Sequence, residues 1–267
     1  MITFNKIFKI SIMEEFQYKM SYISGVICQL AFGFMYIMLY STFFNNGVPQ
    51  DFTTEQMSTY VWLSQMFFAA ICFTDVCKKE ISLPISNGNV GYQMVKPINL
   101  YTYWFMQVLA KPTAAALIRA LPIFVITIFF PKGYGLTLPS SWTACLLFFV
   151  SIILGLILIT SIRMICYYVV LYTFDSRGVF SIVGAIFSLL AGCIIPIPLM
   201  PYGVQKILNF MPFRYVNDLP YRIYIGNIGT SSALIQIGIQ LVWIALIVAI
   251  GVLLINNKSK KLIVQGG

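Results

Sequence analysis

The sequence predicts an all-α integral membrane protein, from its composition, the length of its apolar runs and the placement of its cations. Hydrophobic residues make up 59% of the chain and charged residues 9%, whereas about a quarter of the residues of a soluble domain are charged. Runs such as 142–162 and 232–255 contain no charged residue. A helix needs about 20 apolar residues to cross the hydrocarbon layer, so these runs predict transmembrane helices.

The first element, residues 1–20, is apolar but interrupted by charges. A cleavable signal peptide has an uninterrupted apolar core, which this segment lacks. We expect an interfacial helix that lies along the inner face of the membrane. The alternative is that the first span begins early and that its lysines reach back to the membrane surface. The interrupting residues are Lys6, Lys9, Glu14, Glu15 and Lys19.

Six transmembrane spans are predicted beyond this segment. Cations concentrate before the first span, between the second and third, between the fourth and fifth, and after the sixth. The positive-inside rule therefore places both termini and the loop 75–100 in the cytoplasm. The predicted spans are 22–44, 60–74, 104–130, 142–168, 178–195 and 232–255.

The outer segment 196–231 is the exception, because it carries three cations of its own. Prolines end the fifth span and divide the outer segment into two apolar pieces too short to cross. We expect a re-entrant helical hairpin that closes the outer side, the alternative being an ordinary amphipathic loop. Asp218 lies four residues from both Arg214 and Arg222, so we expect an exposed ion pair there. The predicted gate comprises Pro196, Pro198, Pro201, Pro212, Phe213, Arg214, Asp218 and Arg222.

The cytoplasmic loop 75–100 carries apolar residues at positions that face water on this topology. We expect a short amphipathic helix that ends at Gly88 and docks on another protein. The alternative is that the segment packs on the membrane surface or on the ends of its own spans. The predicted docking residues are Glu80, Ile81, Leu83, Ile85, Gly88, Val90, Lys96 and Pro97.

Several chemistries are excluded. The chain contains no histidine, which rules out Ser–His catalysis and helical HExxH metalloproteases. It has no GxxxxGK[ST] loop and so no phosphate-binding loop of its own. Its six cysteines occur singly in apolar stretches and are expected to be packing residues rather than metal ligands. The net charge of +9 is spread along the chain, which fits orientation in a membrane and not a nucleic-acid surface.

Charged residues inside spans are costly and often functional. Lys111 and Arg163 lie toward the cytoplasmic ends of their spans, where we expect them to snorkel. Arg119 lies deeper and has no acidic residue in its own span, so we expect it to face a cavity or a partner helix. No predicted span carries the Asp or Glu that a proton relay uses, which argues against proton-coupled transport.

Two stretches resemble a known family. Residues 195–226, IPIPLMPYGVQKILNFMPFRYVNDLPYRIYIG, and the loop around Ile85 to Asn99, with Gly88 and the Lys96–Pro97 pair, are similar to permeases of the ATP-binding-cassette type-2 superfamily. Within it they look most like the bacterial multidrug, antibiotic- or viologen-resistance exporter permeases. The resemblance extends over nearly the whole chain, but these two stretches carry its specificity.

The resemblance implies an exporter permease in the bacterial cytoplasmic membrane. Such a permease works with two ATPase subunits, which bind ATP and Mg²⁺, and with a second permease, either the same chain or a different one. The loop 75–100 would couple to the ATPase, and the segment 196–231 would form the outer gate. The cargo is a hydrophobic or amphiphilic compound such as a drug, a lipid or an antimicrobial peptide. The alternative function is an ATPase-independent channel or membrane-assembly protein.

Overall fold

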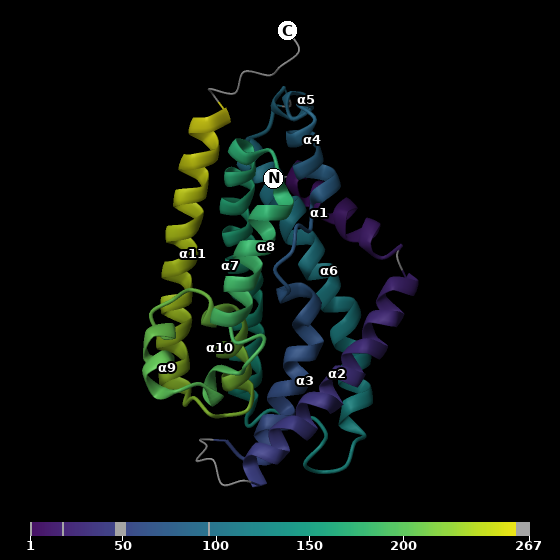
Figure 1. Cartoon of the computed structure of the whole chain (residues 1–267), viewed down its shortest axis with the longest axis vertical. Helices are drawn as coiled ribbons and strands as arrows, with labels where there is room; N and C mark the ends of the chain where they lie inside the picture. The colour runs from purple at the N-terminus through teal and green to yellow at the C-terminus, as the bar shows by residue number, and fades with distance from the viewer. Residues whose placement is uncertain (1, 18, 46–51, 96, 260–267) are drawn as a thin grey trace.

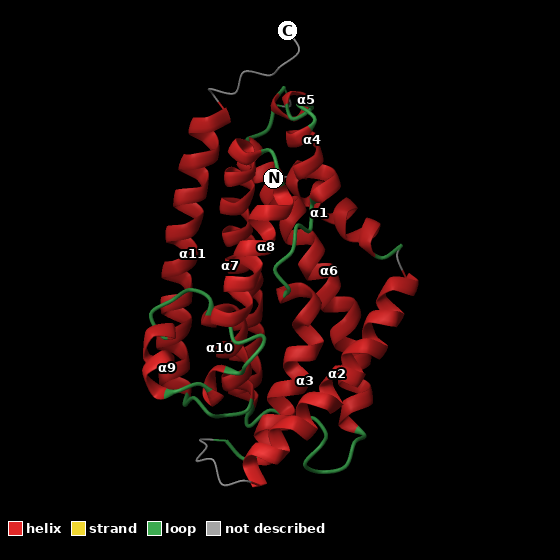
Figure 2. Ribbon diagram, viewed as in Figure 1, coloured by secondary structure: helices red, strands yellow, loops and turns green. Residues whose placement is uncertain are grey.

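Helices make up the chain in the computed structural model, which describes residues 2–17, 19–45, 52–95 and 97–259. No strand occurs in these ranges (Figure 2). The five longest helices are α2 (Lys19–Asn45), α3 (Thr54–Ile71), α6 (Leu100–Ile128), α7 (Trp142–Thr173) and α11 (Thr230–Ser259). Shorter ones are α1 (Ile2–Glu15), α4 (Leu83–Ser86), α5 (Gly91–Met94), α8 (Ser176–Leu190), α9 (Tyr202–Leu208) and α10 (Arg214–Tyr224), with a π turn, η1 (Lys78–Ser82), and a 3-10 turn, η2 (Ile197–Leu199).

Local capping sets where several helices begin. The hydroxyl of Thr53 accepts a hydrogen bond from the backbone N–H of Gln56 at 3.2 Å, and the Gln56 side chain accepts one from the Thr53 backbone N–H at 2.9 Å. This capping box starts α3 at Thr54, well before the predicted residue 60. The helix also ends earlier than predicted, at Ile71, because the backbone of Cys72 leaves the helical region at φ −52° and ψ 119°.

A helix lies at each range predicted as a span, but these helices differ in kind. Within the described residues, four stretches are long and apolar enough to cross a membrane. Helix α8 has only 15 residues, and α3 has 18 with polar side chains along it. The count of six crossings therefore stays a prediction. The four stretches are Tyr22–Thr42, Leu100–Ile128, Trp142–Thr173 and Thr230–Lys258.

The long helices run lengthwise, so that the loops gather at two ends (Figure 1). One end holds α1, α4, α5 and the turn between α7 and α8, where the Ser86 hydroxyl donates to the Phe174 carbonyl at 2.7 Å. The other holds α9, α10, the start of α3 and the turn after α6, where the Ser58 hydroxyl of α3 donates to the Gly133 carbonyl at 2.5 Å. The segments predicted to be cytoplasmic thus share one end, and those predicted to be external share the other. We call the first the loop end, because it holds the loop between α3 and α6.

Helix α1 is separate from α2, because the backbone turns at Phe16 and Gln17. It packs against α6, while Ile10 and Met13 are exposed on its other side. This arrangement differs from an early start of the first span. The helix is compatible with an interfacial position, which stays a prediction.

Helix α10 lies inside the bundle, packed against α7, α3 and α11. Its residues from Arg214 to Tyr221 are all buried. Helix α9 is different, since most of its residues are exposed. The two short pieces predicted between the fifth and sixth spans are therefore helical, but they are not equivalent. Whether they re-enter the membrane stays a prediction.

Candidate functional site

The loop between α3 and α6 turns most of its apolar residues inward. Ile81, Ile85 and Val90 are 0%, 1% and 4% exposed, and they belong to the core of this chain. The prediction that these three form a face for a partner protein is therefore wrong, and the alternative, packing on the ends of its own helices, is what the structure has. An apolar pattern in the sequence predicts that residues are buried, but it does not tell whether the same chain or a partner protein buries them. The outward residues are Leu83, Tyr92 and Val95.

Gly88 ends the short helix as predicted. Its φ is +75°, a left-handed conformation that glycine adopts without strain. The backbone N–H of Val90 donates to the Pro84 carbonyl at 3.0 Å across this turn, which folds α5 back onto α4. Pro97 is exposed, and Lys96 lies outside the described residues.

Side chains tie this loop to three helices. Glu80 accepts from Lys111 of α6 at 2.8 Å, and the same Lys111 lies 3.8 Å from Glu15 of α1. Gln93 donates to the Glu80 carbonyl and accepts from the indole of Trp104, both at 2.7 Å. The prediction that Lys111 snorkels is wrong, because these two carboxylates hold its ammonium group.

Helix α7 holds the other side of the loop. The Tyr167 hydroxyl donates to the Asp75 carboxylate at 2.9 Å and accepts from the Cys77 backbone N–H at 3.0 Å. Burial raises the pKa of the Cys77 thiol to about 12, so this cysteine is a neutral packing residue near pH 7.

Arg163 does not snorkel either. Its side chain is fully buried, and its Nη2 donates to the carbonyls of Ala70 and Cys72 at 3.2 and 2.7 Å. These carbonyls belong to the last turn of α3, which carries the negative end of the helix dipole. The guanidinium of Arg163, which belongs to α7, therefore caps the C-terminus of α3. The position of Arg163 within its predicted span does not indicate this role.

Asp218 sits at the centre of a buried polar cluster at the opposite end. Its carboxylate lies 3.4 Å from Arg214 and 3.9 Å from Arg222, and it accepts from the Tyr60 hydroxyl at 3.1 Å. The predicted i,i+4 pairs are therefore present. The expectation that they are exposed is wrong, because Asp218 is 0% exposed. Its partner Tyr60 comes from α3, so the cluster joins α3 to α10.

The other predicted gate residues lie in the turns that precede α9 and α10. Pro196 is buried and precedes η2, and the exposed Pro201 precedes α9. Pro198 and Pro212 are half-buried. The Phe213 ring packs edge-on against Phe187 of α8 at 5.9 Å between centroids.

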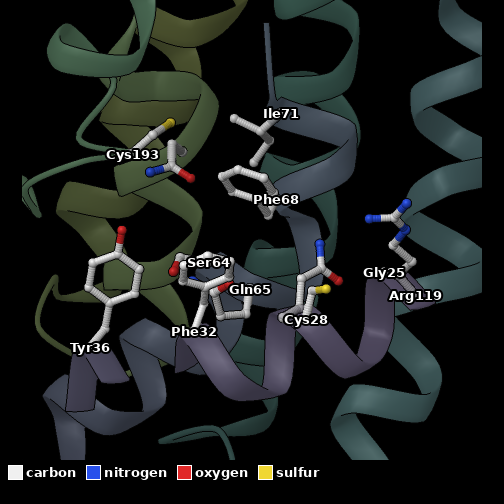
Figure 3. Close-up of a pocket in the computed structure, with 12 residues that line it drawn as sticks. Gly25, Cys28, Phe32, Tyr36, Ser64, Gln65, Phe68, Ile71, Arg119 and Cys193 are labelled. Carbon is white, nitrogen blue, oxygen red and sulfur yellow. The ribbon is translucent and has the colours of Figure 1, made fainter. Parts of the chain in front are cut away.

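Arg119 faces a cavity, as predicted. The cavity has a volume of about 250 Å³ and lies between α2 and α3, with Arg119 entering from α6 (Figure 3). Apolar side chains of Phe32, Phe68 and Ile71 share its wall with polar ones. The polar lining residues are Gln29, Ser64, Gln65, Arg119 and Asn217, beside Cys28 and Cys193.

A second cavity of about 240 Å³ lies on the loop side of the first and shares Arg119 with it. Tyr22, Lys111 and Glu15 are among the residues that line it. A narrow third cavity continues the first toward the other end, past Tyr60 and Pro196. All three cavities border α3, which contributes Ser64 and Gln65 to the first and the third and Ala69 to the second.

A model of the ABC-2 family transporter protein matches residues 29–266. The chain belongs to this ABC-2 family. Comparison with curated proteins and with solved structures gave no match. The matched range of this ABC-2 protein includes the loop, the Asp218 cluster and every polar residue of the first cavity, and it begins after α1.

Sequence reasoning missed several residues of the site. Gln29 is the one amide side chain in the run 22–44, which is a signal that could have marked it. Tyr167 and Trp104 gave no such signal, because an aromatic residue in an apolar run is ordinary. Tyr167 and Trp104 bind the loop through hydrogen bonds, and these depend on the tertiary fold, which brings polar groups of the loop next to both side chains.

Proposed function

We propose that this ABC-2 protein is the transmembrane permease subunit of an ATP-driven exporter. In this proposal a separate ATPase drives alternating access, and the cargo is a hydrophobic or amphiphilic compound such as a drug, a lipid or an antimicrobial peptide. The observation that carries the proposal is the loop between α3 and α6. Its residues bond to α6 and α7 and reach α1 through Lys111, so we expect a displacement of the loop to pass to these three helices.

The docking surface of the loop consists of its outward residues. Leu83, Tyr92 and Val95 are 42%, 78% and 83% exposed, and the exposed Lys78 and Lys79 lie in the adjoining η1. An ATPase surface with an apolar pocket and an acidic rim complements this set. Glu80 serves a different purpose, since it passes a displacement of the loop to Lys111.

The outer gate is the Asp218 cluster together with the turns before α10. Tyr60 connects this cluster to α3, the helix along which the cavities lie. A shift of α3 driven from the loop end is therefore felt at Asp218. This geometry supports a gate that opens when α3 and α10 separate.

The proposed complex contains two ATPase subunits and a second permease, either the same chain or a paired one, in a bacterial cytoplasmic membrane with both termini inside. ATP and Mg²⁺ bind to the ATPases. The alternative function, an ATPase-independent channel or membrane-assembly protein, needs no docking surface on the loop. It predicts that the exposed loop residues have no bound partner.

Purification from native membranes tests the proposal. We expect an ATP-binding-cassette ATPase to co-purify with the tagged chain, and the chain alone to hydrolyse no ATP above background. A Lys132→Gln variant changes an exposed residue at the opposite end and should recover the same ATPase. Hydrolysis by the isolated chain, or recovery of the chain from native membranes without an ATPase, would contradict the proposed role.

A further inference from the structure

The cavity around Arg119 has the chemistry of a binding site. Its residues come from separate parts of the chain: Gln29 from α2, Gln65 from α3, Arg119 from α6 and Asn217 from α10. Figure 3 shows the Arg119 guanidinium on the side of the cavity formed by α6, with Phe68 and Ile71 projecting from α3. Polar groups thus converge from several helices on one small volume.

Gln29 is the first evidence that this volume holds a ligand. Its side chain is 4% exposed, and neither its Oε1 nor its Nε2 has a hydrogen-bond partner among the described residues. Buried amides are normally hydrogen-bonded, since leaving one unpaired is costly. An amide directed into a cavity offers a donor and an acceptor together, which suits the oxygen atoms and hydroxyl groups of a polar headgroup.

Arg119 is the second piece of evidence that the cavity holds a ligand. No carboxylate lies within 4.0 Å of its guanidinium among the described residues, and its Nε has no hydrogen-bond partner. Glu15, which lines the second cavity together with Arg119, pairs with Lys111 instead. Arg119 therefore places a positive charge within an apolar helix without a paired anion. Such a charge is energetically costly in a membrane and is typically functional.

The protein fixes the position of this guanidinium. It lies 5.4 Å over the centroid of the Tyr22 ring, and a Cβ placed on Gly25 would be 2.7 Å from its central carbon. One side is thus occupied by the α2 backbone and an aromatic face. Guanidinium groups held in this way recognise phosphate or carboxylate through paired hydrogen bonds.

We propose that this cavity binds the anionic headgroup of an amphiphile, with Arg119 pairing to its phosphate or carboxylate and Gln29 hydrogen-bonding beside it. A volume of about 250 Å³ suits a headgroup and not a whole amphiphile. Phe32 and Phe68 line the cavity and are 52% and 45% exposed, so they offer an alkyl tail apolar surface that continues from the cavity to the outside of the chain. The inference deepens the proposed function, since it names the chemical class of the cargo.

Binding to the purified chain in phosphatidylcholine nanodiscs tests the proposal without any ATPase. The probe is dodecyl phosphate, compared with dodecyltrimethylammonium, which has the same tail and the opposite charge. We expect wild type to prefer the phosphate at least tenfold. We expect Arg119→Gln to abolish that preference, Arg119→Lys to keep part of it and Gln29→Leu to weaken phosphate binding several-fold. Lys132→Gln removes one exposed positive charge away from the cavity and should leave binding unchanged.

A second variant protects the test against misfolding. Gly25→Ala keeps the charge of Arg119 but crowds its guanidinium, so we expect weaker phosphate binding with a normal thermal unfolding profile. Equal binding of the two amphiphiles to wild type, or unchanged preference in Arg119→Gln, would overturn the site. Competition by inorganic phosphate alone at the same concentration would show a site for a free anion, which also contradicts an amphiphile.

Two further measurements are needed. One identifies the source of the headgroup, and the other distinguishes failure of the binding site from failure of the proposed exporter function. Displacement of the probe by phosphatidylglycerol in the nanodisc assigns the headgroup to a bilayer lipid, and no displacement assigns it to another anionic amphiphile. Both outcomes uphold the site. Loss of the ATPase partner with intact binding refutes the exporter but not the site. Failure of binding in a chain that still recovers its ATPase refutes the site alone.

Discussion

Asp218 shows what a buried carboxylate requires of its neighbours. It holds two cations that are themselves largely buried, Arg214 and Arg222, with side-chain exposures of 5% and 19%. Arg214 also donates to Asn209 and to Gln236, the latter at 3.2 Å. Removing one member of such a group leaves an uncompensated charge away from water, which costs far more than the loss of a surface pair. At the residue scale, this cluster is therefore structural as well as a candidate gate.

The variant Asp218→Asn tests this at the residue scale. We expect it to lower the stability of the folded chain by about 3–5 kcal/mol, because Arg214 and Arg222 lose their anion. Glu55→Gln is the matched control, since Glu55 is an exposed acid at the same end, and its change should stay within about 0.5 kcal/mol. Thermal unfolding in detergent measures both. Equal unfolding temperatures for the two variants would show that the cluster is not a stabilising element.

At the element scale, the packing of α2 and of the loop decides the site. The apolar runs and the loop cations predicted the helices and their grouping at two ends, because both follow from local composition. They did not predict that Ile81, Ile85 and Val90 turn inward, that α10 is enclosed or that Arg163 caps α3. Each of these depends on a partner distant in sequence. The lone Gln29 and Arg119 were visible in the sequence, but their shared cavity required the approach of α2 to α6.

Two glycine-to-alanine variants test the packing of α2, one in α2 itself and one in α11 as a control. A Cβ on Gly33 would overlap the ring of Trp62, which is fully buried and donates to the Tyr134 carbonyl at 2.7 Å. Gly33→Ala should therefore destabilise by about 1–3 kcal/mol. Gly238 of α11 has nothing within 4 Å of the corresponding position, so Gly238→Ala should stabilise by up to about 1 kcal/mol through helix propensity. Unfolding shifts of the same sign would contradict this packing.

The loop carries a second element-scale prediction. Tyr92→Asp changes an exposed residue and should weaken ATPase recovery while the chain folds normally. Ile85→Asp buries a carboxylate in the core of this chain and should reduce folded protein before any effect on the ATPase can be seen. Fluorescence-detected size exclusion and ATPase pull-down separate the two effects. A well-folded Ile85→Asp chain that fails only to recover the ATPase would show that Ile85 belongs to the docking face after all.

For the whole molecule, the two ends differ in the residues that they present. The loop end presents Lys78, Lys79 and Tyr92, and the other end encloses the Asp218 cluster. Between them the cavities follow α3, with Arg119 shared by the first two. This order supports a path from one end to the other, along a helix that both the loop and the gate contact.

Orientation in the membrane is the corresponding prediction. Single cysteines at Tyr92 and Lys132 are both exposed replacements, at the loop end and the opposite end. In intact cells an impermeant maleimide should label position 132 and not position 92, because the positive-inside rule puts the loop end in the cytoplasm. External labelling at position 92 would reverse the orientation.

In the proposed exporter a separate ATPase drives rearrangement of the cavity, and Cys28 reports on that rearrangement directly. Cys28 lines the cavity and is exposed, so a chain that keeps Cys28 as its one cysteine gives a single alkylation rate. In the complex, we predict that this rate changes several-fold between the nucleotide-free state and the state trapped with ADP and vanadate after ATP hydrolysis, and that the change disappears when the ATPase is omitted. An alkylation rate that is the same in all three samples would contradict an ATP-driven permease.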